Sequence, residues 1–493
     1  MKPNVSLPLA SSYNTRGLIA YENVFTSALD QRKINSMYEP VTNSLTGKST
    51  LYLCKRFGAS LGSDTYGTSG QVAYQVIRKP GAASFTSANH WVFSTSGNDI
   101  RASDAAATTT VIATASGYVP TWVEITLISG TETLVVQLRN SSGAQTVWYA
   151  TAIGTFTQIT DADFTALTLR GKMQFLNGYA FVLTDTNKIY NSEPNSLSSW
   201  LATDFITKEI KQDVPRGLAR LGNQIIAFGA QTMEVFVNVG NATGSPLVSD
   251  KDRAQDVGLN IFPHGSTNYY AVLGNKMYFH GTRGGNPGRG IFVYDGNTAE
   301  RVSNNAIEKI LTNITSSVTY SINSFTFAGQ EAIAVGLDVT TAATQRWLMY
   351  FPKWNDWFEW NSTVFSPVNS KAGFYLGVGS NQHRLYQFGI DADYQDDTTD
   401  YTMTHQFALP SEDNDRKFMR WCGVKGDTAR SASSLGVSFS DDDGQNWSTA
   451  RNIDMTSDDK AITRCGAFKN RQVRLTHTGN IDVRLEKFLA RVE

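Results

Sequence analysis

A repeated strand–turn–strand unit constrains the fold of this chain more than any other feature of its sequence. Each unit has a turn of small residues, an apolar strand, a polar turn and a second strand ending in Tyr, Phe or Val. The units begin near residues 89, 133, 178, 222, 274, 330 and 373. Their separation of roughly 43 to 56 residues is close to that of four-stranded propeller blades. One small sheet cannot bury both of its faces, whereas blades stacked in a ring cover each other.

The rest of the sequence also indicates an all-β protein. Gly, Ser, Thr and Asn alternate with aromatic and β-branched runs of strand length, and long helical periodicity is scarce. We therefore predict a β-propeller of six or seven blades. The alternative is a string of unrelated hairpins in β-sandwiches.

Two short helices are predicted as exceptions. In the segment "SNNAIEKILTNI", Asn304 or Asn305 is expected to cap a helix with Ile307 and Ile310 on one face. A second helix is predicted near residues 23–37.

Changes in composition divide the chain into three parts. Residues 1–50 are polar and less periodic, and we expect them to form an N-terminal extension or arm. Residues 51–390 contain the repeated units and form the predicted propeller. Residues 391–493 follow an acidic, turn-rich connector and read as a separate, platform-like C-terminal β domain with alternating strands.

One motif in the C-terminal part invites an enzymatic interpretation. Ser440, Asp442, Gly444 and Trp447 fit the Asp-box pattern S-x-D-x-G-x-x-W, which is familiar from sialidase propellers. In such a turn the carboxylate accepts backbone N–H groups, the glycine takes a positive φ and the tryptophan packs beneath. A hydrolase would carry several boxes on successive blades, and this sequence has one, outside the predicted propeller. We therefore interpret the four residues as a structural turn.

Neither composition nor motifs indicate catalysis, a cofactor or a metal. The formal net charge is -1, which argues against a dedicated polyanion-binding protein. Three widely spaced cysteines form no CxxC motif, so neither a zinc ribbon nor a disulfide framework is expected. No apolar run is long enough for a transmembrane helix, and no signal peptide is evident. We expect no catalytic, cofactor-binding or metal-binding residues.

The aromatic stretch Arg346–Ser362 contains four tryptophans. These indole rings could form a carbohydrate platform, but we expect them to form the core of a blade.

The acidic stretch at residues 391–400 does not match a calcium-binding EF-hand loop, because its sixth and twelfth positions are Asp396 and Thr402. We predict a solvated linker, with a bound cation as the alternative.

Read in chain order, several segments resemble the tail-hub, or packaged-DNA stabilisation (tail nozzle), proteins of short-tailed bacteriophages. The resemblance begins at residues 30–58, "DQRKINSMYEP…GKSTLYLCKRFG", where Phe57 stands in place of the family's usual proline. The most recognisable segment is "GNKMYFHGTRGGNPGRGIFVYDGNTAERVSNNAIEKIL". The other similar segments are "LNGYAFVLTDTNKIYNSEPNSLSSW", "LGNQIIAFGAQTMEVFVNVGNATGSPL", "RWLMYFPKWNDWFEW" and "VSFSDDDGQNWS…RCGAFKNRQVRL".

The resemblance implies a virion structural protein rather than an enzyme. Members of this family form a hexameric ring below the portal and adaptor, extend the DNA channel, help to retain packaged DNA and seat tailspikes, fibres or a needle. The implied partners are further copies of the chain, the head-to-tail adaptor, the spike, fibre or needle proteins, and double-stranded DNA that passes without sequence-specific binding. The implied location is the virion tail, after synthesis in the host cytoplasm.

Two other functions compete with this one. An Asp-box propeller could hydrolyse glycans, or a propeller could bind carbohydrate without cleaving it. The single Asp-box argues against the hydrolase.

Overall fold

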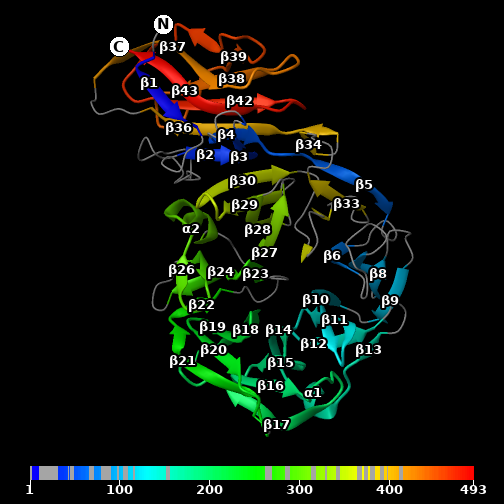
Figure 1. Cartoon of the computed structure of the whole chain (residues 1–493). Coiled ribbons are helices and arrows are strands. Elements are labelled where there is room, and N and C mark those ends of the chain that lie inside the picture. Colours follow the sequence, from blue (N-terminus) through cyan, green and yellow to red (C-terminus); the bar gives the residue numbers. More distant parts are fainter. Residues whose placement is uncertain are drawn as a thin grey trace.

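Sheets follow one another round a ring, and a further β layer lies across one side of that ring, in the computed structural model of the protein (Figure 1). The structure describes residues 3–9, 31–42, 44, 49–65, 72–78, 90–96, 99–103, 109–114, 117–151, 156–211, 213–241, 243–260, 269–283, 289–312, 318–327, 330–339, 345–362, 369–370, 376–377, 384–388, 394–396, 398–409 and 415–493.

The ring is made of antiparallel hairpins that pair in chain order. One sheet contains β10 (Tyr118–Ile128), β11 (Thr131–Asn140), β12 (Gln145–Ala150) and β13 (Thr157–Gln158). The next contains β14 (Leu169–Leu176), β15 (Tyr179–Thr184), β16 (Lys188–Ser192), β17 (Trp200–Thr207), β18 (Pro215–Leu221), β19 (Gln224–Gly229), β20 (Met233–Asn238) and β21 (Leu247–Gln255). A third contains β22 (Val257–Leu259), β23 (Tyr270–Leu273), β24 (Lys276–Arg283), β25 (Arg289–Tyr294) and β26 (Ala299–Arg301).

Two further sheets pair strands from distant parts of the chain. One contains β31 (Asn369–Ser370), β6 (Val72–Arg78), β7 (His90–Ser96), β8 (Asp99–Ser103) and β9 (Thr109–Thr114). The other contains β32 (Leu376–Gly377), β33 (Arg384–Phe388), β5 (Ala59–Thr65), β34 (Gln395–Asp396) and β35 (Thr399–Asp400). In both, an early strand pairs with a late one, and this pairing closes the ring. The fold is a β-propeller in an all-β chain, as predicted, while the number of blades stays a prediction.

One nine-stranded sheet runs from the ring into the C-terminal layer. Its strands, in spatial order, are β27 (Val318–Phe327), β28 (Gln330–Val339), β29 (Gln345–Phe351), β30 (Asp356–Ser362), β2 (Gln31–Ile34), β36 (Thr402–Ala408), β42 (Gln472–Thr478), β38 (Ser434–Ser440) and β39 (Arg451–Asp454). The short strand β2 pairs in parallel with β30 on one side and antiparallel with β36 on the other. It is therefore the connection between the two parts of this sheet.

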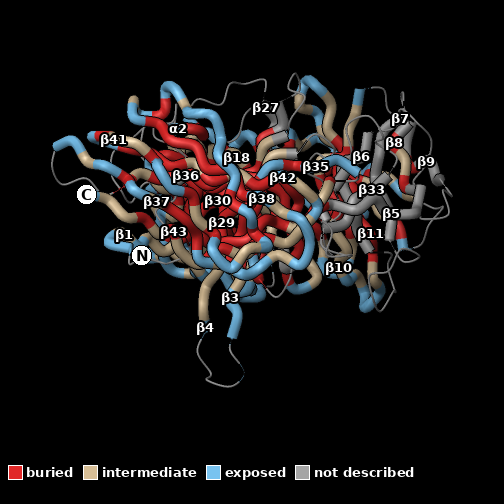
Figure 2. The backbone as a smooth tube through the Cα atoms, turned by 90° about the horizontal axis from the view of Figure 1, so that it is seen from above, coloured by how far each residue is buried: buried red, intermediate tan, exposed pale blue. Residues whose placement is uncertain are grey.

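The second sheet of the C-terminal layer also depends on the N-terminal segment. It contains β3 (Ser36–Thr42), β4 (Ser49–Lys55), β43 (Arg484–Val492), β37 (Lys417–Gly426) and β40 (Ala461–Thr463), with β1 (Val5–Pro8) on β43 and β41 (Ala467–Phe468) on β37. The segment predicted as an extension thus supplies β1, β2, β3 and the first two residues of β4. The far ends of β3 and β4 are exposed and project from the body (Figure 2). The domain boundaries themselves stay a prediction.

The two helices among the described residues are short. Helix α1 (Ala162–Thr165) is capped by Asp161, and α2 (Asn305–Thr312) was predicted from sequence. The Asn304 side chain caps α2 by accepting the Ile307 N–H at 3.0 Å. The helix predicted near residues 23–37 is wrong where the structure describes it, because residues 31–34 and 36–42 form β2 and β3.

The aromatic stretch of β29 and β30 is core, as predicted. Trp347, Trp357 and Trp360 are almost fully buried. One apolar cluster contains Trp347 and Trp360 together with Leu9 and with Phe488 of β43. The hydrophobic core therefore crosses from the ring into the C-terminal layer.

Leu9, just after β1, offers a test of this shared core. Its side chain is fully buried and its backbone N–H donates to the Glu486 carbonyl at 2.9 Å. We expect Leu9→Ala to lower the free energy of unfolding by about 2–5 kcal/mol, because it leaves a cavity. Denaturant unfolding measures the loss. Leu201→Ala, at a leucine that is 46% exposed, is the matched control and should cost less than about 0.5 kcal/mol. Equal losses would contradict the shared core.

Candidate functional site

The Asp-box residues form a closed turn between β38 and β39. The Asp442 Oδ1 atom accepts the Ser440 hydroxyl at 2.7 Å and the Asn446 backbone N–H at 2.9 Å, and Oδ2 accepts the Asn446 side-chain amide at 2.7 Å. Gly444 adopts a φ of 83° and donates its N–H to the Ser440 hydroxyl. Both carboxylate oxygens are therefore engaged within the turn itself.

The tryptophan of the turn is held from two directions. The Trp447 indole N–H donates to the Gly444 carbonyl at 3.1 Å. The guanidinium carbon of Arg474, on the neighbouring β42, lies 3.7 Å from the Trp447 ring centroid. This cation–π contact joins the turn to the sheet beneath it. The arrangement is that of a structural lock.

Hydrogen bonding makes the turn sensitive to acid. The Asn446 backbone N–H lowers the pKa of Asp442 below its usual value, helped by the Asn446 amide and the Ser440 hydroxyl. A carboxyl group with a lowered folded-state pKa stabilises the fold above its unfolded pKa, and this contribution disappears as the pH falls through the folded value.

We expect Asp442→Ala to lower the melting temperature at neutral pH, because it removes the acceptor of three hydrogen bonds. The difference from the native chain should begin to shrink below about pH 4 and disappear as the pH falls through the lowered folded-state pKa, where the native carboxyl is protonated too. Thermal unfolding monitored by circular dichroism at both pH values measures this. Asp458→Ala, at an exposed aspartate, is the control. A difference that stays constant with pH would contradict the model of the turn.

A buried ionic cluster lies where the propeller meets the C-terminal layer. The ammonium group of Lys33 on β2 contacts the carboxylate of Asp356, the first residue of β30, and both side chains are fully buried. The Tyr38 hydroxyl donates to the same carboxylate at 2.7 Å, and so does the Trp357 N–H at 2.8 Å. Burial lowers the pKa of Lys33 and raises that of Asp356, so desolvation opposes the charges that hydrogen bonding supports.

A second buried pair lies beside the first. The Arg56 guanidinium binds Asp396 through two hydrogen bonds of 2.8 and 2.6 Å. Asn35 accepts from Arg56 Nε at 3.1 Å, and the Tyr401 ring lies 3.8 Å from the guanidinium carbon. The prediction of a solvated acidic linker is therefore wrong for Asp396, whose side chain is 4% exposed. The linker's Asp391, Asp393 and Asp397 lie outside the described residues.

The Lys33–Asp356 pair can be tested by removing one charge or both. We expect Asp356→Asn to destabilise the fold by about 3–5 kcal/mol, because Lys33 would remain buried without its counter-charge. The double variant Lys33→Met/Asp356→Leu should recover most of this loss, since apolar groups need no partner. Denaturant unfolding measures both. Additive losses in the double variant would show that the two side chains are not coupled.

His405 lies opposite Lys33 in the pairing of β36 with β2. It is fully buried, and neither ring nitrogen has a hydrogen-bond partner among the described residues. Burial, with the nearby Lys33 charge, lowers the pKa of His405 from 6.5 to about 3. As the pH falls through about 6.5, His405 therefore binds a proton in the unfolded chain but stays neutral in the folded chain. Stability is lost as the pH falls from that value.

We expect His405→Leu to weaken the acid sensitivity of the fold. Between about pH 6 and pH 4, the native chain should lose about 1.4 kcal/mol of unfolding free energy per pH unit more than the variant, because one proton is linked to unfolding. Urea unfolding of both proteins across this range gives the difference. Parallel curves would show that His405 titrates normally in the fold.

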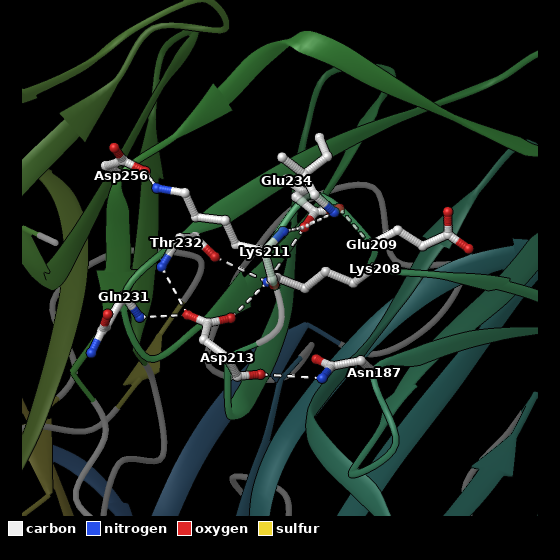
Figure 3. A network of polar contacts seen from close by, with 10 residues as sticks. Asn187, Lys208, Glu209, Lys211, Asp213, Gln231, Thr232, Glu234 and Asp256 are labelled. Atoms are coloured by element: carbon white, nitrogen blue, oxygen red, sulfur yellow. Dashed lines mark hydrogen bonds and ion pairs between the residues drawn. The ribbon is translucent and has the colours of Figure 1, made fainter.

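A third polar network lies within the ring (Figure 3). The fully buried ammonium group of Lys208 binds Asp213 at 2.7 Å and lies 3.5 Å from Glu234. The Glu234 carboxylate accepts three successive backbone N–H groups, from residues 209, 210 and 211. Asp213 accepts the N–H groups of Gln231 and Thr232. These contacts fix the connector between β17 and β18 against the turn between β19 and β20.

A cavity of about 490 Å³ is lined by inner strands of successive ring sheets. Its polar lining includes Glu124 of β10, Lys172 of β14, Arg220 of β18 and Tyr270 of β23. Glu124 is the one carboxylate among the described residues that line it. Glycoside hydrolysis generally uses two carboxyl groups on either side of the scissile bond. The described lining therefore does not hold the carboxyl pair of most glycosidases, although sialidases, which use a Tyr nucleophile, do not need that pair.

The described residues contain no candidate metal cluster and no candidate membrane-spanning helix. No group of three or more His, Cys, Asp and Glu side chains is placed to hold a metal ion there. Nor does any helix in that part of the chain have the length and apolarity needed to cross a membrane.

Sequence reasoning located the Asp-box but missed the three ionic networks. Lys33, Arg56 and Lys208 are single basic residues in polar surroundings, which usually indicate solvated positions. Their partners lie far away in the sequence for Lys33 and Arg56, so no local spacing could have revealed these two pairs. The network at Lys208 is more local, but none of its residue types marks it as buried.

Comparison with solved structures finds propellers of low similarity. The chain matches "YCF48 bound to D1 peptide" at 11% identity and a TM-score of 0.36, covering 68% of this chain and 98% of the other. The designed Ika8 protein matches at 12% identity and 0.33, covering 68% and 99%. An exo-β-1,3-galactanase from Phanerochaete chrysosporium matches at 9% identity and a TM-score of 0.28. This match covers 75% of this chain and 95% of the other. With TM-scores this low, none of these similarities bears on function. No curated protein matches the chain.

The fold defined by the ring and the shared core is a β-propeller. The polar clusters among its described residues stabilise turns and the junction between the propeller and the C-terminal layer. Residues 58–347, more than half of the chain, match the family model described as "Bacteriophage P22 Gp10, beta-propeller". The chain belongs to this phage stabilisation family and is a phage structural protein, as the sequence resemblance implied.

Proposed function

We propose that this protein is the tail hub, or nozzle, of a short-tailed phage. Six copies form a ring below the portal and adaptor, extend the DNA channel, retain the packaged DNA and seat tailspikes or fibres. The single observation that carries this proposal is the family match across the propeller.

The architecture supports a part that holds its shape inside a larger assembly. The propeller is joined to the C-terminal layer by a continuous sheet, a shared apolar cluster and buried ion pairs. Such a junction resists hinge motion, because movement would expose apolar surface and separate buried charges. A hub between a capsid and its spikes needs this rigidity.

The charge balance supports a conduit. The formal net charge of -1 gives the subunit no general attraction for DNA. A strongly basic wall would neutralise phosphates and hold the passing duplex through counterion release.

Native mass spectrometry of the purified protein tests the assembly. We expect a ring six times the 54.1 kDa subunit, either alone or on addition of the adaptor, and electron microscopy should show a central opening. Phage lacking the gene should package DNA and then lose it from the head. A monomer that cleaves a fluorogenic glycoside, or mutant heads that keep their DNA, would overturn the proposal.

A further inference from the structure

Two cysteines of the C-terminal layer lie in direct contact. Cys422 is on β37 and Cys465 follows β40, and their sulfur atoms are 3.7 Å apart. Both residues are buried. This is the contact distance of two unbonded sulfurs, so a modest shift would bring them to bonding distance.

The backbone around Cys465 is held in place on both sides. Its N–H donates to the Met419 carbonyl at 3.1 Å, and its carbonyl accepts from the guanidinium of Arg471. Arg471 also binds Asp441 with two hydrogen bonds of 2.7 Å. Arg451 donates to the carbonyls of the two residues before Cys465. The thiol of Cys465 is therefore fixed in its position beside Cys422.

The surroundings of the two thiols also differ, and the difference favours one of them as the attacking nucleophile. The Cys422 thiol, by hydrogen bonding, lowers the pKa of Cys465 to about 7, and the nearby arginines act in the same direction. The same hydrogen bond and burial raise the pKa of Cys422. Cys465 is also the more accessible of the two, at 6% exposed against 0% for Cys422. It is thus the thiol that reacts first, because the thiolate is the attacking form.

We propose that Cys422 and Cys465 are a covalent modification site at which a small-molecule disulfide oxidises the pair to an intramolecular disulfide. The Cys465 thiolate attacks one sulfur of the oxidant, forms a mixed disulfide and releases one small thiolate. Cys422, after giving its proton to that thiolate, attacks the Cys465 sulfur and releases the second small thiolate, which takes up from solvent the proton that Cys465 lost on ionisation. The protein loses two hydrogens and the oxidant gains them.

The bond would close a loop that contains β38, β39 and the Asp-box turn between them. Restricting this loop in the unfolded chain stabilises the folded layer. Arg471 already ties the Cys465 segment to the Asp-box turn inside this loop, since it binds both Asp441 and the Cys465 carbonyl. Disulfide formation depends on this local geometry and not on assembly into a ring.

The third cysteine is an internal control. Cys54 is also buried, but its thiol contacts the Glu39 carboxylate at 3.5 Å. Burial raises the pKa of Cys54, and the Glu39 charge adds to this effect. We therefore expect Cys54 to stay reduced under conditions that oxidise the pair.

The test starts from the folded, reduced full-length protein. It is incubated with oxidised glutathione, its free thiols are blocked with N-ethylmaleimide, and it is digested with trypsin without reductant. We expect a cross-linked product of peptides 421–425 and 465–469, and an intact mass about 2 Da lower before blocking, because two hydrogens are lost. Cys54 should carry the single blocking group.

Two variants and a stability measurement complete the test. Cys54→Ser should still form the cross-link, and Cys465→Ser should not. Oxidation should raise the melting temperature of the native chain by several degrees and leave that of Cys465→Ser unchanged. Three blocked thiols after oxidation, a persistent glutathione adduct at Cys465, or a cross-link through Cys54 would each overturn the proposal. The cross-linked peptide and the mass change are measured on the native chain. A variant that fails to fold therefore does not affect this result.

Discussion

The four residues of β2 hold the two halves of this protein in one sheet. On one side the strand pairs with β30 of the propeller and on the other with β36 of the C-terminal layer. Its Lys33 meets Asp356 at the first residue of β30, in a position where neither charge reaches water. The strand is too short to contribute much by hydrogen bonding alone. The buried ionic cluster and the apolar residues that continue across the junction fix β2 in its position between β30 and β36.

The propeller and the C-terminal layer are therefore joined mechanically, whatever their domain boundaries. If either charge at the junction is removed, the other is left unpaired in an apolar environment. An unpaired buried ion is the costly case. The Asp-box turn makes a similar use of polar groups on a smaller scale. Its carboxylate is fully occupied by the turn, and Trp447 is held by Arg474 of the next strand. Its resemblance to a sialidase motif reflects turn chemistry.

The ring could be predicted from sequence because its information is local. Each hairpin carries its own apolar alternation and turn residues, as in the Asn177–Gly178 turn, where both residues have positive φ. The buried tryptophans of β29 and β30 and the cap of α2 follow from the same short-range rules. The part played by the N-terminal segment could not be predicted in this way. The partners of β2 and β3 lie hundreds of residues away or follow a polar turn, and Lys33 and Arg56 carry charges that normally indicate solvent.

The position of β2 also has a consequence for the order of events during synthesis. Residues 31–34 leave the ribosome early, but β36 begins at Thr402. At 5–20 residues per second, the gap corresponds to roughly 20–70 s during which this strand has no C-terminal partner. The ring hairpins can form in sequence as they emerge, whereas the sheet that joins them to the rest must wait for almost the whole chain. A translation product that ended before β36 would thus contain most of the propeller strands. It would lack the strands that pair with β2 to form the C-terminal layer.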